Sequence, residues 1–322
     1  MPPSPAPTPP DLSSQVARLF FDRQMSKVEI ANHLGISRFR VARLIEGALA
    51  DGLVRIEYRD VPLEDRTLAT AIEERFGLDL CAVADVATDE DALGPVARLA
   101  GAVVDGLIGP AEVIGIAWGS TMAAVIRALP ARTATEIEVV PLAGGSHRLA
   151  RDEDAGILTR ALADRVGGTD HPLFAPAFVA DATIRDGLLR EPEVARIVAR
   201  YADLSLAIVG IGSMPGDHGA ASSSLLRSGV LDAAEVARLA ALGAVGDLVV
   251  HPFDPDGRFV APELAARAVA IDVERLRATP RVVAVAVGSG KALAIRGALR
   301  TGIVRILVTD RATAHAVLEA SG

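Results

Sequence analysis

The chain has 322 residues, a net charge of −8 and 50% hydrophobic residues, so it is long enough for two domains and too acidic to bind nucleic acid over its whole surface. Its single cysteine, Cys81, excludes an intrachain disulfide and a cysteine-based zinc site, and its apolar surroundings predict a buried, inert thiol. No apolar stretch has transmembrane length and no targeting peptide is recognisable, so we expect a cytoplasmic protein with no membrane partner.

The first ten residues contain six prolines and no apolar periodicity, which predicts a disordered tail. We assign residues 11–59 to a small all-α domain and residues 60–322 to a large α/β domain.

Residues 19–56 predict a helix-turn-helix. Ser26 and Glu29 have the spacing of a capping box at the start of a helix over Lys27–Leu34, and Gly35 can end that helix in the left-handed conformation. The residues expected on its apolar stripe are Val28, Ile30, Ala31 and Leu34.

Ser37 is expected to cap the next helix, the one that would enter the DNA major groove. Its inward positions are Val41, Leu44, Ile45 and Ala48. Arginine suits the outer face because its planar fork can grip guanine edges or phosphate oxygens with two hydrogen bonds. The residues predicted to contact operator DNA are Lys27, Ser37, Arg38, Phe39, Arg40 and Arg43.

An ordinary surface helical hairpin is the alternative interpretation of this segment. Between Gln15 and Ile45 there are six basic and two acidic residues, a local balance of +4 in a chain whose total is −8. This contrast favours the DNA-binding interpretation and confines DNA contact to the N-terminal domain.

From Pro62 onward helical patterns alternate with short β-branched apolar runs, which predicts a Rossmann-like parallel sheet covered by helices on both faces. The expected strands are 80–84, 113–117, 137–141, 204–209, 282–287 and 304–309. The expected helices include 89–108, 121–129, 155–166, 233–242, 291–300 and 312–320.

Three of these strands run into glycine-bearing loops. The loops are Trp118-Gly119-Ser120-Thr121, Ile211-Gly212-Ser213 and Gly288-Ser289-Gly290-Lys291. The carboxyl ends of parallel strands converge on one crevice, where glycine amides, helix N-termini and hydroxyl groups can bind an anion. Each loop alone is better explained by turn chemistry, but the three together predict an anion-binding pocket.

No metal or cofactor site is predicted. The last loop lacks the glycine and the Ser or Thr of a phosphate-binding NTPase motif, at the positions of Val285 and Ala292. The histidines are scattered without the spacing of metal ligands, at His147, His171, His218 and His251.

The chain resembles the SorC family of bacterial transcriptional regulators, in which a helix-turn-helix precedes a sugar-binding domain similar to sugar-phosphate isomerases. The matching stretches cover most of residues 15 to 320: IANHLGISRFRVARLI, GIAWGSTM, VVPLAGG, PLFAPAFV, AIVGIGS, GAVGDLVVHPFDPDG and GKALAIRGALRTGIVRILVTD. The resemblance implies a regulator without enzymatic activity that binds a sugar or sugar phosphate, forms dimers or tetramers, and changes its affinity for an operator when the effector binds.

By position, the resemblance implies an effector site made of Gly119, Ser120, Thr121, Gly212, Ser213, Asp247 and Lys291. Val287 stands where family members often have the first of two glycines ahead of the lysine, which leaves open whether the effector carries a phosphate. Two alternatives also remain open at this point. The chain could be an isomerase-like enzyme with Asp247 as general base, or a DNA-binding oligomer without a small-molecule effector.

Overall fold

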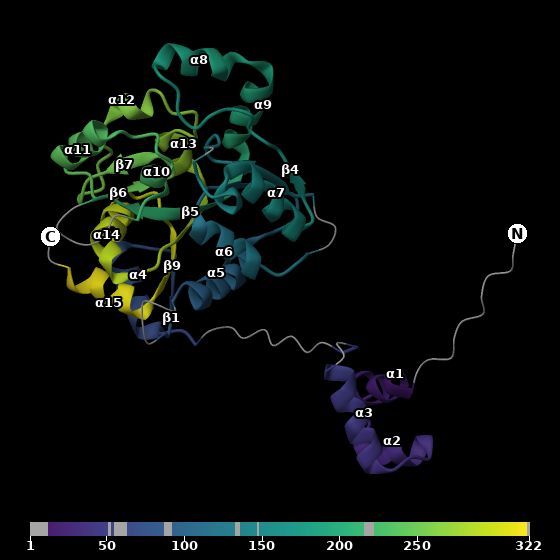
Figure 1. Cartoon of the computed structure of the whole chain (residues 1–322). Coiled ribbons are helices and arrows are strands. Elements are labelled where there is room, and N and C mark those ends of the chain that lie inside the picture. The colour runs from purple at the N-terminus through teal and green to yellow at the C-terminus, as the bar shows by residue number, and fades with distance from the viewer. Residues whose placement is uncertain are drawn as a thin grey trace, which may run out of the picture. The chain divides into compact units, whose positions relative to one another are not determined.

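The computed structural model describes residues 12–50, 53–54, 63–86, 92–132, 136–146, 148–215 and 222–320. The chain divides into two units, Met1–Asp60 and Val61–Gly322 (Figure 1). The predicted tail at residues 1–10, the predicted boundary at 59–60, and His147 and His218 lie outside the described residues.

The described part of the small unit contains three helical segments. Helix α1 (Leu12–Ala17) continues as the π-helix η1 (Arg18–Asp22), and α2 (Lys27–Leu34) and α3 (Arg38–Ala50) follow. Their buried contacts form a separate core of Val16, Ile30, Ala31, Val41 and Ile45.

The predicted capping box at the start of α2 is present. The Ser26 amide donates to Glu29 Oε2 at 2.8 Å and the Glu29 amide donates to Ser26 Oγ at 3.3 Å. Gly35 ends the helix with a φ of 64°. One sequence expectation is wrong: Val28 is 52% exposed, because it lies two residues before Ile30 and therefore almost opposite that buried residue on the helix.

The large unit is built on a parallel sheet with the strand order β1-β9-β8-β5-β2-β3-β4. All six predicted strands are present within a few residues of the expected limits, and their burial patterns show both sheet faces covered. The strands are β1 (Leu80–Ala84), β2 (Val113–Ile116), β3 (Glu138–Pro141), β4 (Thr169–Asp170), β5 (Leu204–Ser213), β8 (Arg281–Val285) and β9 (Ile306–Asp310).

Helices cover the two faces of this sheet. On one face α5 (Leu93–Leu107) packs on α6 (Ser120–Ala128), which packs on α7 (Ala155–Val166). On the other face α15 (Arg311–Glu319) packs against both α4 (Arg66–Phe76) and α14 (Ala292–Arg300). The six predicted helices of this domain are confirmed, except for residues 89–91 of the first, which lie outside the described residues, while α4 was not predicted.

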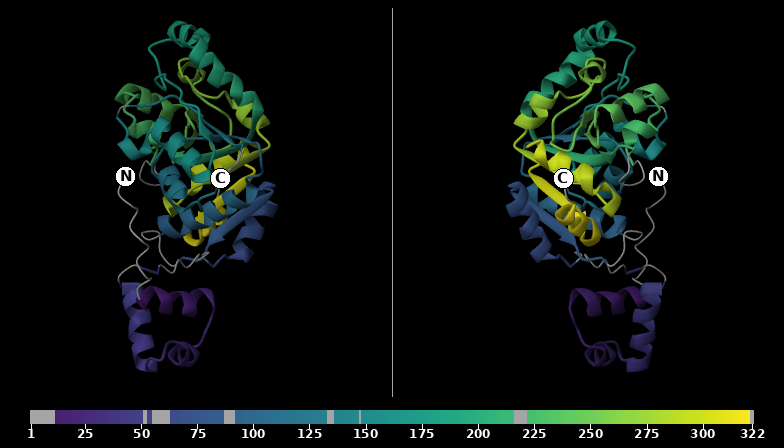
Figure 2. Two further views of the ribbon diagram at one scale, coloured as in Figure 1. Left: turned by 90° about the vertical axis from the view of Figure 1, so that its right-hand side faces the viewer. Right: turned by 90° about the vertical axis from the view of Figure 1, so that its left-hand side faces the viewer.

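The remaining helices are short or peripheral. They are α8 (Ala182–Arg190), α9 (Pro192–Arg200), α10 (Ser224–Arg227), α11 (Ala233–Ala241), α12 (Pro262–Ala265) and α13 (Val273–Ala278), with single 3-10 turns η2 (Arg151–Glu153), η3 (Tyr201–Asp203) and η4 (Ser289–Lys291). Helix α8 has no buried residue and projects from the large unit in both views of Figure 2.

The sheet departs from the all-parallel prediction at one end of β5. This strand runs on past its parallel neighbours, and Ile211–Ser213 pairs antiparallel with β6 (Gly246–Leu248), which forms a hairpin with β7 (His251–Phe253). A second small core that includes Leu225, Leu239 and Leu264 lies in the segments that follow β5 and the hairpin. This addition carries part of the predicted site.

Cys81 is buried, as predicted, and burial raises the pKa of its thiol to about 12. Within the described part of the chain, no helix has the length and apolar character needed to cross a bilayer, and no cluster of three or more potential metal-ligating side chains occurs.

Candidate effector pocket and DNA interface

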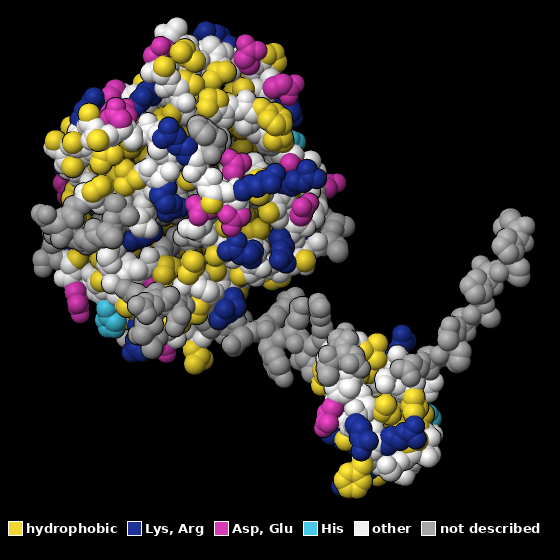
Figure 3. Space-filling view, viewed as in Figure 1, with side chains coloured by type: hydrophobic (Ala, Val, Ile, Leu, Met, Phe, Trp, Pro, Cys, Tyr) yellow, Lys and Arg dark blue, Asp and Glu magenta, His cyan; other side chains and the backbone are white. Residues whose placement is uncertain are grey.

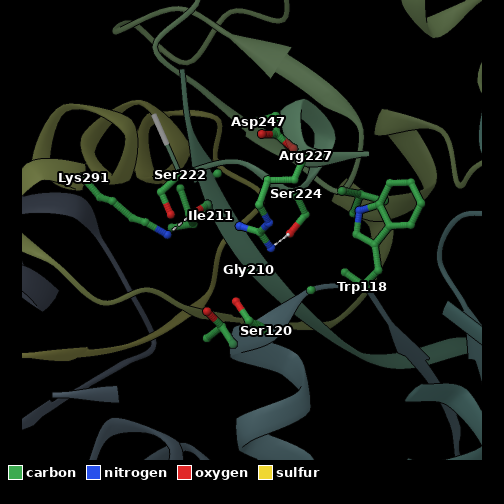
Figure 4. Close-up of a pocket in the computed structure, with 14 residues that line it drawn as sticks. Trp118, Ser120, Gly210, Ile211, Ser222, Ser224, Arg227, Asp247 and Lys291 are labelled. Carbon is green, nitrogen blue, oxygen red and sulfur yellow. Dashed lines mark hydrogen bonds between the residues drawn. The ribbon is translucent and has the colours of Figure 1, made fainter. Parts of the chain in front are cut away.

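A pocket lies at the carboxyl ends of β2 and β5, between the parallel sheet and the β6–β7 hairpin (Figure 4). Six of the seven residues that the sequence assigned to the effector site line it: Gly119, Ser120, Thr121, Gly212, Asp247 and Lys291. The other lining residues are Ala117, Trp118, Gly210, Ile211, Ser222, Ser224, Arg227 and Val249.

The first predicted loop presents the N-terminus of α6 to the pocket. Gly119 precedes the helix with a φ of 116°, a conformation that side chains rarely adopt. It provides no capping side chain, so the first-turn N–H groups of α6 remain without such a partner. These groups and the hydroxyls of Ser120 and Thr121 can donate hydrogen bonds to an anion.

The second predicted loop is not a loop but the end of strand β5, next to Asp247 on β6. Gly212 is paired with Asp247 across the antiparallel ladder, and a Cβ at Gly212 would lie 2.1 Å from Asp247 Oδ1. Ser223 Oγ donates to the same carboxylate oxygen at 2.6 Å. Asp247 is 4% exposed, and burial raises the pKa of its carboxyl to about 6 against the lowering effects of Ser223 and Lys291.

Ser213 does not line the pocket, in contrast to the sequence prediction. It follows Gly212 on an extended strand, so its side chain lies on the opposite side of that strand. Ser213 is 4% exposed, and its hydroxyl accepts a hydrogen bond from the Ser222 amide at 3.0 Å. Its role here is to hold the segment that leads into α10.

The third loop contributes its lysine but not its glycines. The Gly288 amide donates to Thr313 Oγ1 at 2.8 Å and therefore does not face an anion. Lys291 Nζ reaches into the pocket and donates to the Ile211 carbonyl at 3.1 Å. Burial lowers the pKa of Lys291, while nearby Asp247 acts in the opposite direction.

Arg227, which the sequence analysis missed, supplies a second cation. Its guanidinium donates to Glu153 Oε2 at 2.8 Å and to Ser224 Oγ at 3.0 Å. Figure 4 shows the Arg227 and Lys291 side chains directed toward the same space, with Ser120 across from them. The only sequence signal was an arginine shortly after three consecutive serines at 222–224.

The small unit presents the predicted DNA-contacting face on α3. Ser37 Oγ accepts from the Arg40 amide at 3.2 Å, as expected for a helix cap. Arg38, Phe39, Arg40 and Arg43 are exposed, while Val41, Ile45 and Ala48 on the other side of the helix are buried. Lys27 and Ser37 are also exposed, and Lys and Arg side chains gather on the visible face of this unit (Figure 3).

Residues 61–319 match the family model described as "Putative sugar-binding domain". The erythritol catabolism regulatory protein EryD of Brucella abortus is 31% identical over 95% of this chain and 96% of its own length. The sorbitol operon regulator of Klebsiella pneumoniae is 28% identical, over 95% and 96%. The crystal structure of the full-length Klebsiella regulator SorC superposes with a TM-score of 0.83 at 27% identity, covering 97% of this chain and 100% of that chain.

The chain belongs to the SorC family of sugar-binding transcriptional regulators. The fold class expected from the sequence, a helix-turn-helix followed by a Rossmann-like α/β domain, is confirmed by the same comparisons. The relatives are named as regulators, which agrees with the expected regulatory role.

The lining of this pocket offers groups that can donate hydrogen bonds to an anion. Two cations and an uncapped helix N-terminus face it, and Asp247 is the one carboxylate among its described lining residues. That carboxylate accepts a hydrogen bond from the Ser223 hydroxyl and lies near Lys291. Its position fits a group that orients Ser223 and Lys291.

Two neighbouring glycines on β5 give a matched test of this packing. Gly212→Ala places a methyl group against Asp247 and Ser223, so we expect a loss of about 1–3 kcal/mol in the free energy of unfolding. The methyl group added by Gly210→Ala has no atom within 4 Å. This variant should therefore change the free energy of unfolding by less than about 0.5 kcal/mol. Urea unfolding of both variants measures the difference, and equal losses would contradict the described contact.

The buried carboxyl of Asp247 predicts a pH dependence of stability. Its folded-state pKa of about 6 exceeds the ordinary 3.8, so the folded chain binds this proton more tightly than the unfolded chain. The contribution of Asp247 to stability should therefore fall as the pH rises from about 4 to about 6, by about 3 kcal/mol at most. Asp247→Asn should lack this decline.

The measurement is urea unfolding of both proteins between pH 4 and pH 7. Because the other titrating groups are shared, the decline appears in the difference between the two stability profiles. Parallel profiles would show that Asp247 titrates in the folded protein as it does in the unfolded chain.

Proposed function

We propose that an anionic sugar or polyol, with a phosphate as its charged group, binds in this pocket and controls the affinity of the regulator for operator DNA. The observation that carries the proposal is the convergence of Lys291, Arg227 and the N-terminus of α6 on one cavity. Each of these groups favours negative charge, and a phosphate offers enough oxygen acceptors for all three.

The names of the relatives support the sugar or polyol part of this proposal. They describe regulators of a sorbitol operon and of erythritol catabolism. In this chain, hydroxyl groups of such an effector would meet Ser120, Thr121, Ser222 and Ser224, while its carbon skeleton would lie against Trp118 and Val249. We leave Ser213, which the sequence had placed in the effector site, out of the proposed site, because its hydroxyl accepts a hydrogen bond from the Ser222 amide.

Control of DNA binding requires that effector and operator favour different arrangements of the same assembly. We propose a dimer or a tetramer, in which α3 of two copies reads two half-sites about 34 Å apart. An effector that changes subunit packing then changes this separation, and the coupling must be reciprocal, typically about 5- to 150-fold.

The effector part is tested with Arg227→Ala. Arg227 donates charged hydrogen bonds and its side chain is partly exposed, so its loss should weaken effector binding by about 10- to 150-fold with little effect on folding. Isothermal titration calorimetry against sugar and polyol phosphates, each paired with its unphosphorylated form, measures the change. Lys291→Ala should show a loss of similar size.

Arg196→Ala is the matched control, because Arg196 lies on the surface of α9 and pairs with exposed Glu193. This variant should bind the effector as the parent does. If no sugar or polyol phosphate binds the parent protein, or if free sugars bind it equally well, the anionic effector is the wrong assignment.

The DNA part is tested with Arg40→Ala. The backbone amide of Arg40 bonds to Ser37 and survives the change, whereas the exposed guanidinium is lost. We expect operator affinity to fall by about 1–3 kcal/mol if this arginine contacts a base, with effector binding unchanged. Fluorescence anisotropy on operator DNA measures this, again with Arg196→Ala as control, and unchanged DNA affinity would remove Arg40 from the interface.

A further inference from the structure

Phe39 is an unexplained apolar side chain on the DNA-contacting face. It is the second residue of α3, and 76% of it is exposed. Burying a phenyl group gains about 1.5–3 kcal/mol, and this residue gains little of that within the small unit. Its neighbours Arg38 and Arg40 are also exposed, so packing within this unit does not account for the choice of phenylalanine.

The charges around Phe39 indicate the kind of partner that covers it. The guanidinium carbon of Arg38 lies 5.5 Å from the centre of the Phe39 ring, and Arg43 follows one helical turn after Phe39. None of Arg38, Arg40 and Arg43 forms an ion pair with a carboxylate in the described part of the chain. A partner that carries phosphates and offers a small apolar group fits this surface.

In the DNA major groove, thymine alone among the four bases presents such a group, its 5-methyl. A phenyl ring has no hydrogen-bond donor or acceptor group for the polar edges of the other bases. We propose that Phe39 is a specificity-determining residue that contacts a thymine 5-methyl group in each half-site, beside a G·C pair read by Arg38.

The spacing of the two side chains supports reading of adjacent base pairs. Successive base pairs are separated by about 3.4 Å, so groups 5.5 Å apart, measured from the guanidinium carbon to the ring centre, can reach neighbouring pairs. This inference rests on the proposed function, because it requires α3 to lie in the major groove.

The test begins with selection of binding sites from a randomised duplex DNA library by the full-length protein, Phe39→Ala and Phe39→Leu. We expect the parent to enrich sites with a thymine next to a G·C pair in each half-site. Phe39→Ala should lose the preference for thymine and keep the base preferences at the other positions of the site. Phe39→Leu, which retains an apolar side chain, should keep part of the preference for thymine.

Replacement of the selected thymine by deoxyuridine then removes only the methyl group. Because the Phe39 ring then has no methyl group to pack on, we expect the affinity of the parent to fall about fourfold per substituted half-site and that of Phe39→Ala to stay constant. Because Phe39 is exposed, the thermal melting temperatures of parent and variant should agree, which controls for folding.

The outcomes distinguish DNA reading by α3 from the thymine assignment. If the parent enriches no sequence at all, DNA reading by α3 fails, and the thymine assignment fails with it. If the parent enriches a sequence but Phe39→Ala enriches the same one, or if deoxyuridine weakens both proteins equally, the thymine assignment is overturned while DNA reading by α3 stands.

Discussion

The candidate effector pocket depends on a single close approach, the one between Gly212 and the carboxylate of Asp247. Strand β5 runs beyond the parallel sheet, and its last residues pair with β6, so the two residues face each other across the ladder. Only a residue without a side chain leaves room for the carboxylate there. Once Asp247 lies in that position, it fixes Ser223 at 2.6 Å and with it the start of α10, the helix that ends with Arg227.

The cations of the pocket are held by partners that an anionic ligand can join or replace. Lys291 donates to a backbone carbonyl, and Arg227 is paired with Glu153, whose own backbone carbonyl accepts from the Gly119 amide. A phosphate that draws Arg227 away from Glu153 would therefore act on the loop that precedes α6 as well as on α10. Such a ligand could therefore alter the loop before α6 and helix α10 at once. The two segments are in close contact, since Gly119 of the loop lies against Ser224 of α10.

The sequence predicted the parallel strands and their helices because buried β-branched runs and amphipathic periods are local signals. It also predicted most of the pocket, since glycines and hydroxyls that follow parallel strands meet at one edge of the sheet. It could not predict the β6–β7 hairpin, whose strands have three residues each. Arg227 was missed for the same reason, because a four-residue helix has too few residues to show a period. The sequence also gave no sign that the third glycine-bearing loop turns its Gly288 amide away from the pocket, because the amide's partner, Thr313, lies 25 residues away.

The proposed roles in effector binding and in DNA reading place different demands on the residues assigned to them. Asp247 and Gly212 are held in place by close contacts, so a substitution at either affects the packing of the large unit as well as the pocket. The residues of the α3 face, in contrast, are exposed, and the buried core of the small unit lies on the other side of that helix. If α3 reads the operator as we propose, substitutions at Phe39 or Arg40 can change which sequence is bound at little cost in stability, whereas a change of effector would have to be made within a packed site.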